Sequence, residues 1–375
     1  MTFTIIELLS ILTVFLFSFF VMYLVIAETS KKLSNLIFAT YLMIIILDFS
    51  AYFYPKFITL TYTVEMLRME VLAGLKAPVL YLYVLSVLYD DFKIKIKYLL
   101  FFVPLSITLV VLIPDFFNVS ARKQALFFQN FYDQPEAVFI TFFAYIVGYV
   151  FLFAGLYQIK RYQKIVKQNY SNLNALVNCV WLKQFLIIII IGTTITLIKN
   201  MYQLSYDDIE ITNNLRILFL LFAIVFASWL FSKALLAPKT FQGINASLLP
   251  IKGKANKIED ENVKRIELFM KEKESYLDPS LTLRKLGVQL NIPPRELSIL
   301  INQHIGKHFF DFVNEYRVKK AMETLRNTSL QKKTIQEIMY DVGFNSKNSF
   351  NTAFKKHTNL TPTQYKKNAG SQLFE

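Results

Sequence analysis

Residues able to bind a metal or act as nucleophiles are few in this chain, and their spacing argues against catalysis. His304 and His308 lie four residues apart, as two ligands on one helix turn would. Gly306 interrupts a helix between them, however, and no cysteine or carboxylate pair completes a site. The single cysteine, Cys179, has no activating neighbour in the sequence. Neither a glycine-rich dinucleotide motif nor a P-loop occurs. We therefore predict a non-enzyme with no catalytic residues, no metal and no cofactor.

Two ionisable residues within apolar runs are candidates for a functional pair in a membrane. Asp48 and Lys76 each lie in the outer half of such a run, and adjacent spans would place them at similar depth. Ionisable groups in a membrane are costly, and those that occur commonly serve a function. Three interpretations stay open: a buried structural ion pair, a pair that senses a ligand or signal, or a misplaced boundary of one run.

The composition of the chain indicates which kinds of domain hold these residues. The chain has 375 residues, of which 54% are hydrophobic and 18% charged, and its net charge is +14. An ordinary soluble domain is about 45–50% apolar and about 25% charged. Residues 252–375 contain 22 of the 41 Lys and Arg residues and all three histidines. The first two-thirds therefore resemble a membrane protein and the last third a soluble basic domain, whose charge indicates nucleic acid or anionic lipid as a partner.

The apolar part contains seven runs that approach the roughly 20 residues needed to span a bilayer. The fourth run is the shortest and contains Pro104. We predict a seven-helix transmembrane domain over residues 1–236, with spans at 5–27, 36–54, 67–89, 97–113, 137–159, 182–200 and 215–236.

Charge in the loops predicts the orientation of these spans, because Lys and Arg accumulate on the cytoplasmic side. No basic residue precedes the first span, whereas Lys31 and Lys32 follow it. With the N-terminus outside, the inner loops carry nine Lys and Arg residues and the outer loops carry three. We therefore expect a multi-pass protein of the bacterial inner (cytoplasmic) membrane with its C-terminal domain in the cytoplasm.

Residues 237–262 are predicted to be a cytoplasmic linker. Proline and glycine recur in them without hydrophobic periodicity, which is typical of a connection. The basic run Lys252–Lys257 has two interpretations: contact with anionic lipid, or a solvated group of charges.

Residues 263–370 show two short helix–turn–helix patterns. In the first, a turn at Asn291–Pro294 leads into a helix over Pro294–Ile305 that Gly306 ends. In the second, Thr334 opens a helix, and Ser346 caps another over Lys347–His357. One helix over Phe309–Arg326, about 27 Å long, joins them. Such a spacing allows the second helix of each unit to enter successive major grooves about 34 Å apart.

Several residues at fixed spacing resemble the AraC/XylS family of transcription regulators. They are Arg317-x3-Ala321-x3-Leu325, Ile335-x-Glu337-Ile338, Val342-Gly343-Phe344-x-Ser346-x2-Ser349-Phe350-x3-Phe354-Lys355-Lys356 and Thr361-Pro362-x2-Tyr365. The resemblance, which covers about 100 residues, implies a seven-helix tandem helix–turn–helix DNA-binding domain, here behind a membrane bundle as in membrane-anchored members of the family. Gly287 stands where alanine is usual, and Asn359 stands where glycine is usual.

The resemblance also implies which residues face DNA. They are Arg295, Ser298, Ile299 and Asn302 in the first unit, and Lys347, Asn348, Asn351 and Thr352 in the second. Asparagine can pair with adenine, and Arg or Lys with guanine, whereas Ile299 can only contact a thymine methyl group. Lys355 and Lys356 are better placed to contact phosphates, which position a protein without specifying sequence.

The sequence thus predicts an all-α protein with a seven-span bundle and a tandem helix–turn–helix domain. Its predicted function is a membrane-integrated one-component transcription regulator that binds operator DNA and senses an unknown ligand through the bundle, with a homodimer possible. Two alternatives remain: a transporter or channel with a regulatory basic tail, and an inert membrane anchor for a DNA-binding domain. The few polar groups and the lack of an internal repeat disfavour a transporter.

Overall fold

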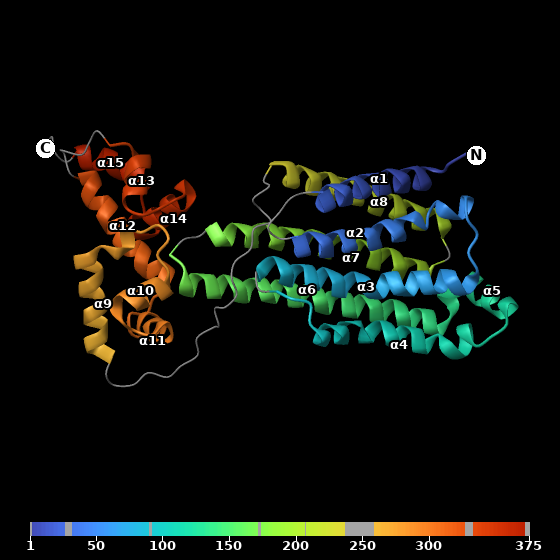
Figure 1. The fold of residues 1–375 in the computed structure, drawn as a ribbon. Helices are drawn as coiled ribbons and strands as arrows, with labels where there is room; N and C mark the ends of the chain where they lie inside the picture. The colour runs from blue at the N-terminus through green and yellow to red at the C-terminus, as the bar shows by residue number, and fades with distance from the viewer. Residues whose placement is uncertain are drawn as a thin grey trace. The chain divides into compact units, whose positions relative to one another are not determined.

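The computed structural model of the protein describes residues 2–26, 32–89, 92–171, 174–206, 208–236, 259–326 and 333–371 (Figure 1). Contacts divide the chain into two compact units. The first unit contains Met1–Ile159 and Asn178–Ala246, and the second contains Lys160–Val177 and Ser247–Glu375. Within the described ranges every extended regular element is a helix and no strand is formed, which confirms the helical fold class.

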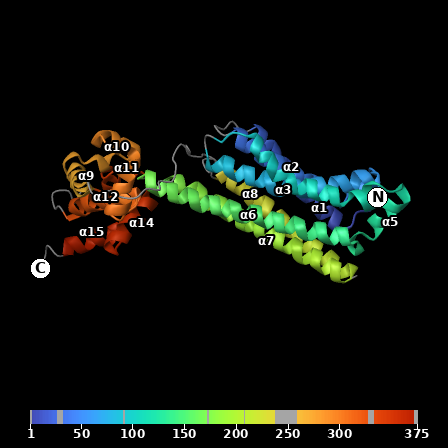
Figure 2. The same ribbon diagram turned by 90° about the horizontal axis from the view of Figure 1, so that it is seen from below.

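Six long apolar helices make up most of the first unit and lie side by side in both views (Figures 1 and 2). Each is long and apolar enough to cross a membrane. Helix α1 packs against α2 and α8, and α2 packs against α3. The six are α1 (Ile5–Ile26), α2 (Lys32–Ser50), α3 (Tyr62–Leu88), α6 (Pro135–Asn169), α7 (Asn174–Ser205) and α8 (Ile209–Leu236).

The predicted fourth span is shorter than the others. It consists of a 3-10 helix, η2 (Ile96–Phe102), continued by α4 (Val103–Val111), with Pro104 in the first turn of α4. A π-helical turn, η3 (Ile113–Phe117), follows and contains Pro114. Because proline lacks an N–H group and clashes with the preceding turn, it begins or ends a helix here. The fourth run is therefore the shortest, as predicted, and the count of seven spans stays a prediction.

Short helices close one end of the first unit. They are η1 (Tyr54–Lys56), α5 (Ala121–Gln129) and η4 (Phe131–Asp133). An apolar cluster joins Met66 of α3 and Ile140 of α6 to Phe116, Phe127 and Phe131. The connection between α4 and α6 is thus packed against the bundle.

The second unit has two apolar cores joined by α12 (Phe309–Arg326). The first core lies among α9 (Glu259–Lys273), η6 (Ser275–Leu277), α10 (Leu283–Leu290), α11 (Pro294–Ile299), η7 (Leu300–His304) and the start of α12. The second lies among the rest of α12, α13 (Ile335–Asp341), α14 (Lys347–Thr358) and α15 (Pro362–Ser371). Each core contains one helix–turn–helix unit.

Tight turns and close backbone contacts account for the Asn and Gly residues at special positions in both helix–turn–helix units. Asn291 and Asn359 adopt positive φ angles of 53° and 59°, the left-handed backbone conformation that asparagine accepts more readily than most residues. A Cβ atom on Gly287 would lie 2.7 Å from the Ile292 carbonyl oxygen. Gly343 has φ of 89°, and a Cβ there would lie 2.7 Å from the carbonyl oxygen of Leu277.

Most predicted elements of this unit are confirmed. The joining helix has the predicted bounds, Thr334 and Glu337 form a capping box, and Ser346 caps α14. One prediction was wrong: the helix over Pro294–Ile305 is α-helical only to Ile299 and continues as a π-turn. There the N–H of Ile305 donates to the carbonyl of Leu300, five residues earlier, at 3.1 Å.

Helix α9 begins at Glu259, four residues before residue 263, where the predicted domain starts. The rest of the predicted linker, with the basic run Lys252–Lys257, lies outside the described residues.

Candidate nucleic-acid interface

Helix α14 presents most of the polar residues predicted in the second unit on its exposed face. The hydroxyl of Ser346 accepts the N–H of Ser349 at 3.2 Å and fixes the start of the helix. Phe350 and Phe354 are buried on the opposite face. Asn351 is half-buried, and the other predicted residues are exposed: Lys347, Asn348, Thr352, Lys355 and Lys356. The residues predicted to read bases and those predicted to contact phosphates therefore lie along one helix.

The first unit presents fewer of its predicted residues. Arg295 is exposed, whereas Ile299 and Asn302 are half-buried. Ser298 is only 1% exposed, so its expected position on an outward face is not where the structure places it. Ser298 lies between the buried Leu297 and the half-buried Ile299, on the side of this short helix that packs into the first core.

Asn302 is held by groups of its own unit. Its Nδ2 donates to the carbonyl oxygen of Ser298 at 2.8 Å and to the Ser298 hydroxyl at 3.0 Å. Its Oδ1 lies 2.8 Å from Nδ1 of His308, within hydrogen-bond distance. An amide engaged on both sides must exchange these bonds before it can pair with a base, so Ser298 and His308 serve to position Asn302.

A groove of about 310 Å³ separates the end of the first unit's second helix from the end of α14. Asn302 and Lys356, one predicted DNA contact from each unit, both line it. Lys356 forms an ion pair with Asp311 of α12 at 2.6 Å, and Lys307 forms one with Glu315. The two helix–turn–helix units thus meet at a charged groove.

Sequence reasoning missed these two carboxylates. Asp311 and Glu315 are four residues apart on the predicted joining helix, which was the available signal that they share a face. Burial raises the pKa of Glu315, but hydrogen bonds from Lys307 and Lys319 outweigh it and hold the pKa below its usual value. Glu315 is therefore charged at neutral pH and keeps Lys307 engaged.

Asp48 and Lys76 are brought together in the first unit, with Nζ 2.5 Å from Oδ2. Sequence reasoning did not single out two further basic residues of the long helices, Lys199 of α7 and Arg216 of α8, whose Nη1 donates to Oδ1 of Asn213 at 3.0 Å. The available signal was that each lies near the predicted outer end of its span.

The part of the chain that the structure describes contains no group of three His, Cys, Asp or Glu side chains that could hold a metal ion.

The C-terminal residues are similar to known DNA-binding proteins. Residues 286–368 match the family model of a helix-turn-helix domain. The HTH-type transcriptional regulator GlxA of Rhizobium meliloti is 35% identical over 98 residues, which is 26% of this chain and 28% of that protein. An uncharacterized HTH-type transcriptional regulator of Pseudoalteromonas carrageenovora is 34% identical over 86 residues, 23% of this chain and 46% of that protein. The chain therefore spans less than half the length of these curated relatives.

Two solved structures are similar to part of the chain. One is the C-terminal domain of AraT, a response regulator from Geobacillus stearothermophilus, at 30% identity, 30% coverage of this chain, 88% coverage of that chain and a TM-score of 0.26. The other is the C-terminal domain of the two-component response regulator yesN from Fusobacterium nucleatum, at 33% identity, 28% and 99% coverage and a TM-score of 0.25. From the family match and the named relatives, the C-terminal part of this chain is a helix–turn–helix domain of the AraC type.

Proposed function

We propose that this protein is a transcription regulator that binds duplex DNA through its two helix–turn–helix units and is held in the membrane by its apolar helices. One observation carries the proposal: two turn–helix elements, α11 with the exposed Arg295 and α14 with its Ser346 cap and exposed polar face, are joined by the single helix α12. Its 18 residues are about 27 Å long. That length is of the order needed for two helices that enter successive major grooves about 34 Å apart.

Binding to DNA can be tested with the full chain in lipid nanodiscs by selection from a pool of random duplexes. A regulator is expected to enrich one sequence, and its affinity should fall steeply with salt because bound Lys and Arg release counterions from DNA. A folded protein that retains no duplex at low salt would contradict the proposal. Retention without enrichment of any sequence would favour a nonspecific basic tail, as in the transporter alternative.

Membrane insertion is supported by the side chains that the bundle leaves exposed. Phe15 is 64% exposed, Ile146 62% and Val225 69%, each on a different long helix. Apolar groups of this size are expected to contact lipid rather than water. The shorter segment Ile96–Val111 also approaches the bilayer thickness of about 30 Å, because 3-10 geometry extends its first seven residues and gives a total of about 27 Å.

Six and seven spans can be distinguished with single cysteines in a Cys179→Ser background. Lys95 precedes the short segment and Asn130 follows it, and both are exposed. If the segment crosses the membrane, a membrane-impermeant maleimide added outside the cell should label Asn130→Cys but not Lys95→Cys. Equal labelling at both positions would show that the segment does not cross.

We further propose that the bundle senses a signal through the ion pair of Asp48 and Lys76. Ionisable side chains within membrane helices are costly, and those that occur commonly serve a function, which supports a sensing role for this pair.

The sensing proposal can be tested against an inert anchor. Asp48→Asn and Lys76→Met should change which genes the intact protein regulates in cells while leaving membrane insertion unchanged. Unchanged transcript profiles with both variants present at normal levels would support the inert anchor.

A further inference from the structure

The end of helix α6 belongs to the C-terminal unit. Contacts group Lys160–Val177 with that unit, although the preceding residues of the same helix lie in the apolar bundle. Gln168, Asn169 and Ser171 are buried, with exposures of 8%, 5% and 1%. Tyr170 forms an antiparallel backbone bridge with Thr282, which caps α10 of the first helix–turn–helix unit. The segment 168–171 is therefore packed against the domain rather than solvated.

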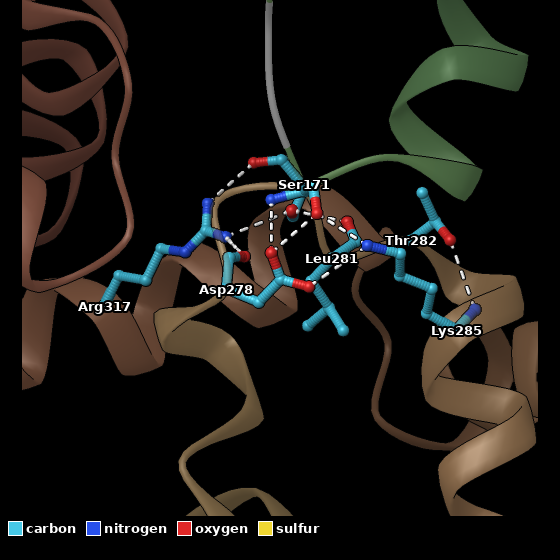
Figure 3. A network of polar contacts seen from close by, with 7 residues as sticks. Ser171, Asp278, Leu281, Thr282, Lys285 and Arg317 are labelled. Carbon is cyan, nitrogen blue, oxygen red and sulfur yellow. Dashed lines mark hydrogen bonds and ion pairs between the residues drawn. The ribbon is translucent and has the colours of Figure 1, made fainter.

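Ser171 supplies two of the acceptors that surround Arg317, a side chain that is 1% exposed (Figure 3). Nη1 of Arg317 donates to the carbonyl of Ser171 at 3.1 Å, and Nη2 donates to its hydroxyl at 3.2 Å. That hydroxyl in turn donates to the carbonyl of Leu281 at 2.7 Å.

The other acceptors of the guanidinium come from the domain itself. Nε donates to the carbonyl of Tyr276 at 2.7 Å, Nη2 to the carbonyl of Asp278 at 2.8 Å, and Nη1 to Oδ1 of Asn314 at 3.3 Å. With the two from Ser171 there are five acceptors, which equals the number of N–H donors on an arginine side chain. Without Ser171 the set is incomplete.

Arg317 lies where the two helix–turn–helix units meet. Tyr276 and Asp278 lead into the first unit, whereas Phe344 belongs to the turn of the second, and the guanidinium carbon lies 5.5 Å from its ring centroid. Gly343 of the same turn packs closely on the carbonyls of Tyr276 and Leu277. None of these groups belongs to α11 or α14, so a segment bound here leaves both exposed faces free.

The contact is suited to reversible formation. All five acceptors are uncharged, so a buried cation has no carboxylate directly bonded to it. Burial lowers the pKa of Arg317 to about 10, and the side chain stays charged at neutral pH. Release of Ser171 would return two N–H groups to water, which offsets much of the hydrogen bonding lost. A small differential free energy can therefore shift the equilibrium.

We propose that residues 168–171 are a docking element, which ties the end of α6 to the junction of the two helix–turn–helix units and so transmits the state of the bundle to DNA binding. The docked state is the one that binds DNA, because it holds Arg317, the 276–282 loop and the second unit's turn in one arrangement. This inference rests on the proposed function.

Docking can be measured without DNA by a crosslink in the full chain. Paired bridge residues lie close enough for a disulfide, so Tyr170→Cys with Thr282→Cys, in a Cys179→Ser background, should be oxidised in isolated membranes. Disulfide formation is detected because the two cysteines no longer react with a maleimide reagent. The control pair, Tyr170→Cys with Val288→Cys, uses a residue that is 75% exposed and about 9 Å further along α10. Equal crosslinking of the two pairs, or none in the first, would overturn the proposal.

The effect of docking on DNA binding can be measured on the full chain in nanodiscs with the selected duplex. Ser171→Ala removes one acceptor and one donor and should weaken binding about threefold to tenfold. Ser171→Trp does not fit a site that is 1% exposed and should weaken it at least about tenfold. Lys167→Trp, at an exposed position of α6, is the matched control and should bind as the parent does.

The outcomes separate this inference from the proposed function. The crosslinked protein is expected to bind DNA at least as tightly as the parent. If both Ser171 variants bind like the parent, the segment does not control DNA binding and the inference fails while the proposed function stands. If the parent and the crosslinked protein both fail to bind duplex although the crosslink forms, the proposed function fails.

Discussion

In the second helix–turn–helix unit, α14 is one α-helix of 12 residues, whereas the corresponding part of the first unit is an α-helix of six residues followed by a π-turn of five. The polar residues of α14 mostly project from its surface, but Asn302 of the first unit bonds to its own unit and Ser298 is buried. Two units of the same plan therefore differ in how much hydrogen-bonding capacity they offer to a partner. The difference suggests that the second unit reads sequence and that the first mainly positions the domain.

The largest expected effect concerns the turn glycines of the two units. Gly343→Ala places a Cβ atom 2.7 Å from the carbonyl oxygen of Leu277 at a residue with φ of 89°, and should destabilise the domain by at least about 2 kcal/mol. Gly306→Ala, at φ of 72° with open space around it, should cost about 1 kcal/mol. Urea unfolding of a fragment from residue 258 onward, followed by circular dichroism, measures both. Equal costs would show that the second turn is not the more constrained.

The next largest effect concerns base recognition, which should differ between the two helix–turn–helix units. Asn351→Ala is expected to weaken binding to the selected duplex by about 1–3 kcal/mol and to relax preference at one or two positions, since it removes a side chain able to pair with adenine. Asn302→Ala should leave the selected sequence nearly unchanged, because its amide is already bonded to Ser298 and His308. Repeating the random-duplex selection with each variant makes the comparison. A change of preference with Asn302→Ala alone would reverse the assignment of the two units.

The caps of the two units offer a third comparison. Thr334 takes part in a capping box, whereas Thr282 accepts a single N–H, that of Lys285 at 3.2 Å. Replacing Thr334 with alanine should therefore cost about 1 kcal/mol of stability, and replacing Thr282 about half as much. The same unfolding experiment on the fragment would rank the two variants, and the opposite order would contradict this account.

The capping box should also respond to pH. Backbone and side-chain hydrogen bonds from Thr334 lower the pKa of Glu337 in the folded domain. A depressed folded pKa gives stability that is present above the unfolded value of about 4.5 and is lost as pH falls through the folded pKa. The stability difference between the parent and Glu337→Gln should accordingly exist at pH 7 and shrink below about pH 4. A difference that is constant from pH 7 to pH 3 would assign the effect to something other than the carboxylate.

The smallest expected effect separates two adjacent lysines. Lys356 is paired with Asp311 in the free domain, whereas no ion pair of Lys355 occurs in the described part of the chain. If both contact phosphates, each alanine variant should lower the salt slope by about one and weaken binding alike on all sequences. Lys355→Ala should have the larger effect, and Asp311→Asn should strengthen binding slightly because it frees Lys356. A variant that changes the selected sequence would not be a phosphate contact.

The sequence predicted those features that depend on local chemistry. Pro, Gly and Asn at turns and Ser or Thr at helix starts indicated both units, and the bounds of α12 followed from its uninterrupted pattern. The π-turn after Ile299 was not predictable in this way, because the expected helix assumed 3.6 residues per turn throughout, and one added residue rotates the side chains that follow. The burial of Ser298 depends on packing that the spacing does not encode.

Other features depend on contacts between distant residues. Arg317 and Ser171 are 146 positions apart, and no pattern in either segment indicates the other. In the apolar first unit, hydropathy located all six long helices of the described residues. The fourth run was predicted to be the shortest and to contain Pro104, and in the structure Pro104 lies in the first turn of α4 and Pro114 in η3.

The rigid joining helix α12 also constrains the DNA that the domain can recognise. A helix of 18 residues cannot lengthen, so the distance between the two exposed faces is set by the protein and not by the operator. One inserted base pair would move one half-site by about 3.4 Å and turn it by about 34° around the duplex axis, away from its reading helix. Operators of this protein should therefore tolerate base changes between the two contacted segments but not insertions or deletions there. Genome positions with the right half-sites at the wrong spacing would be silent.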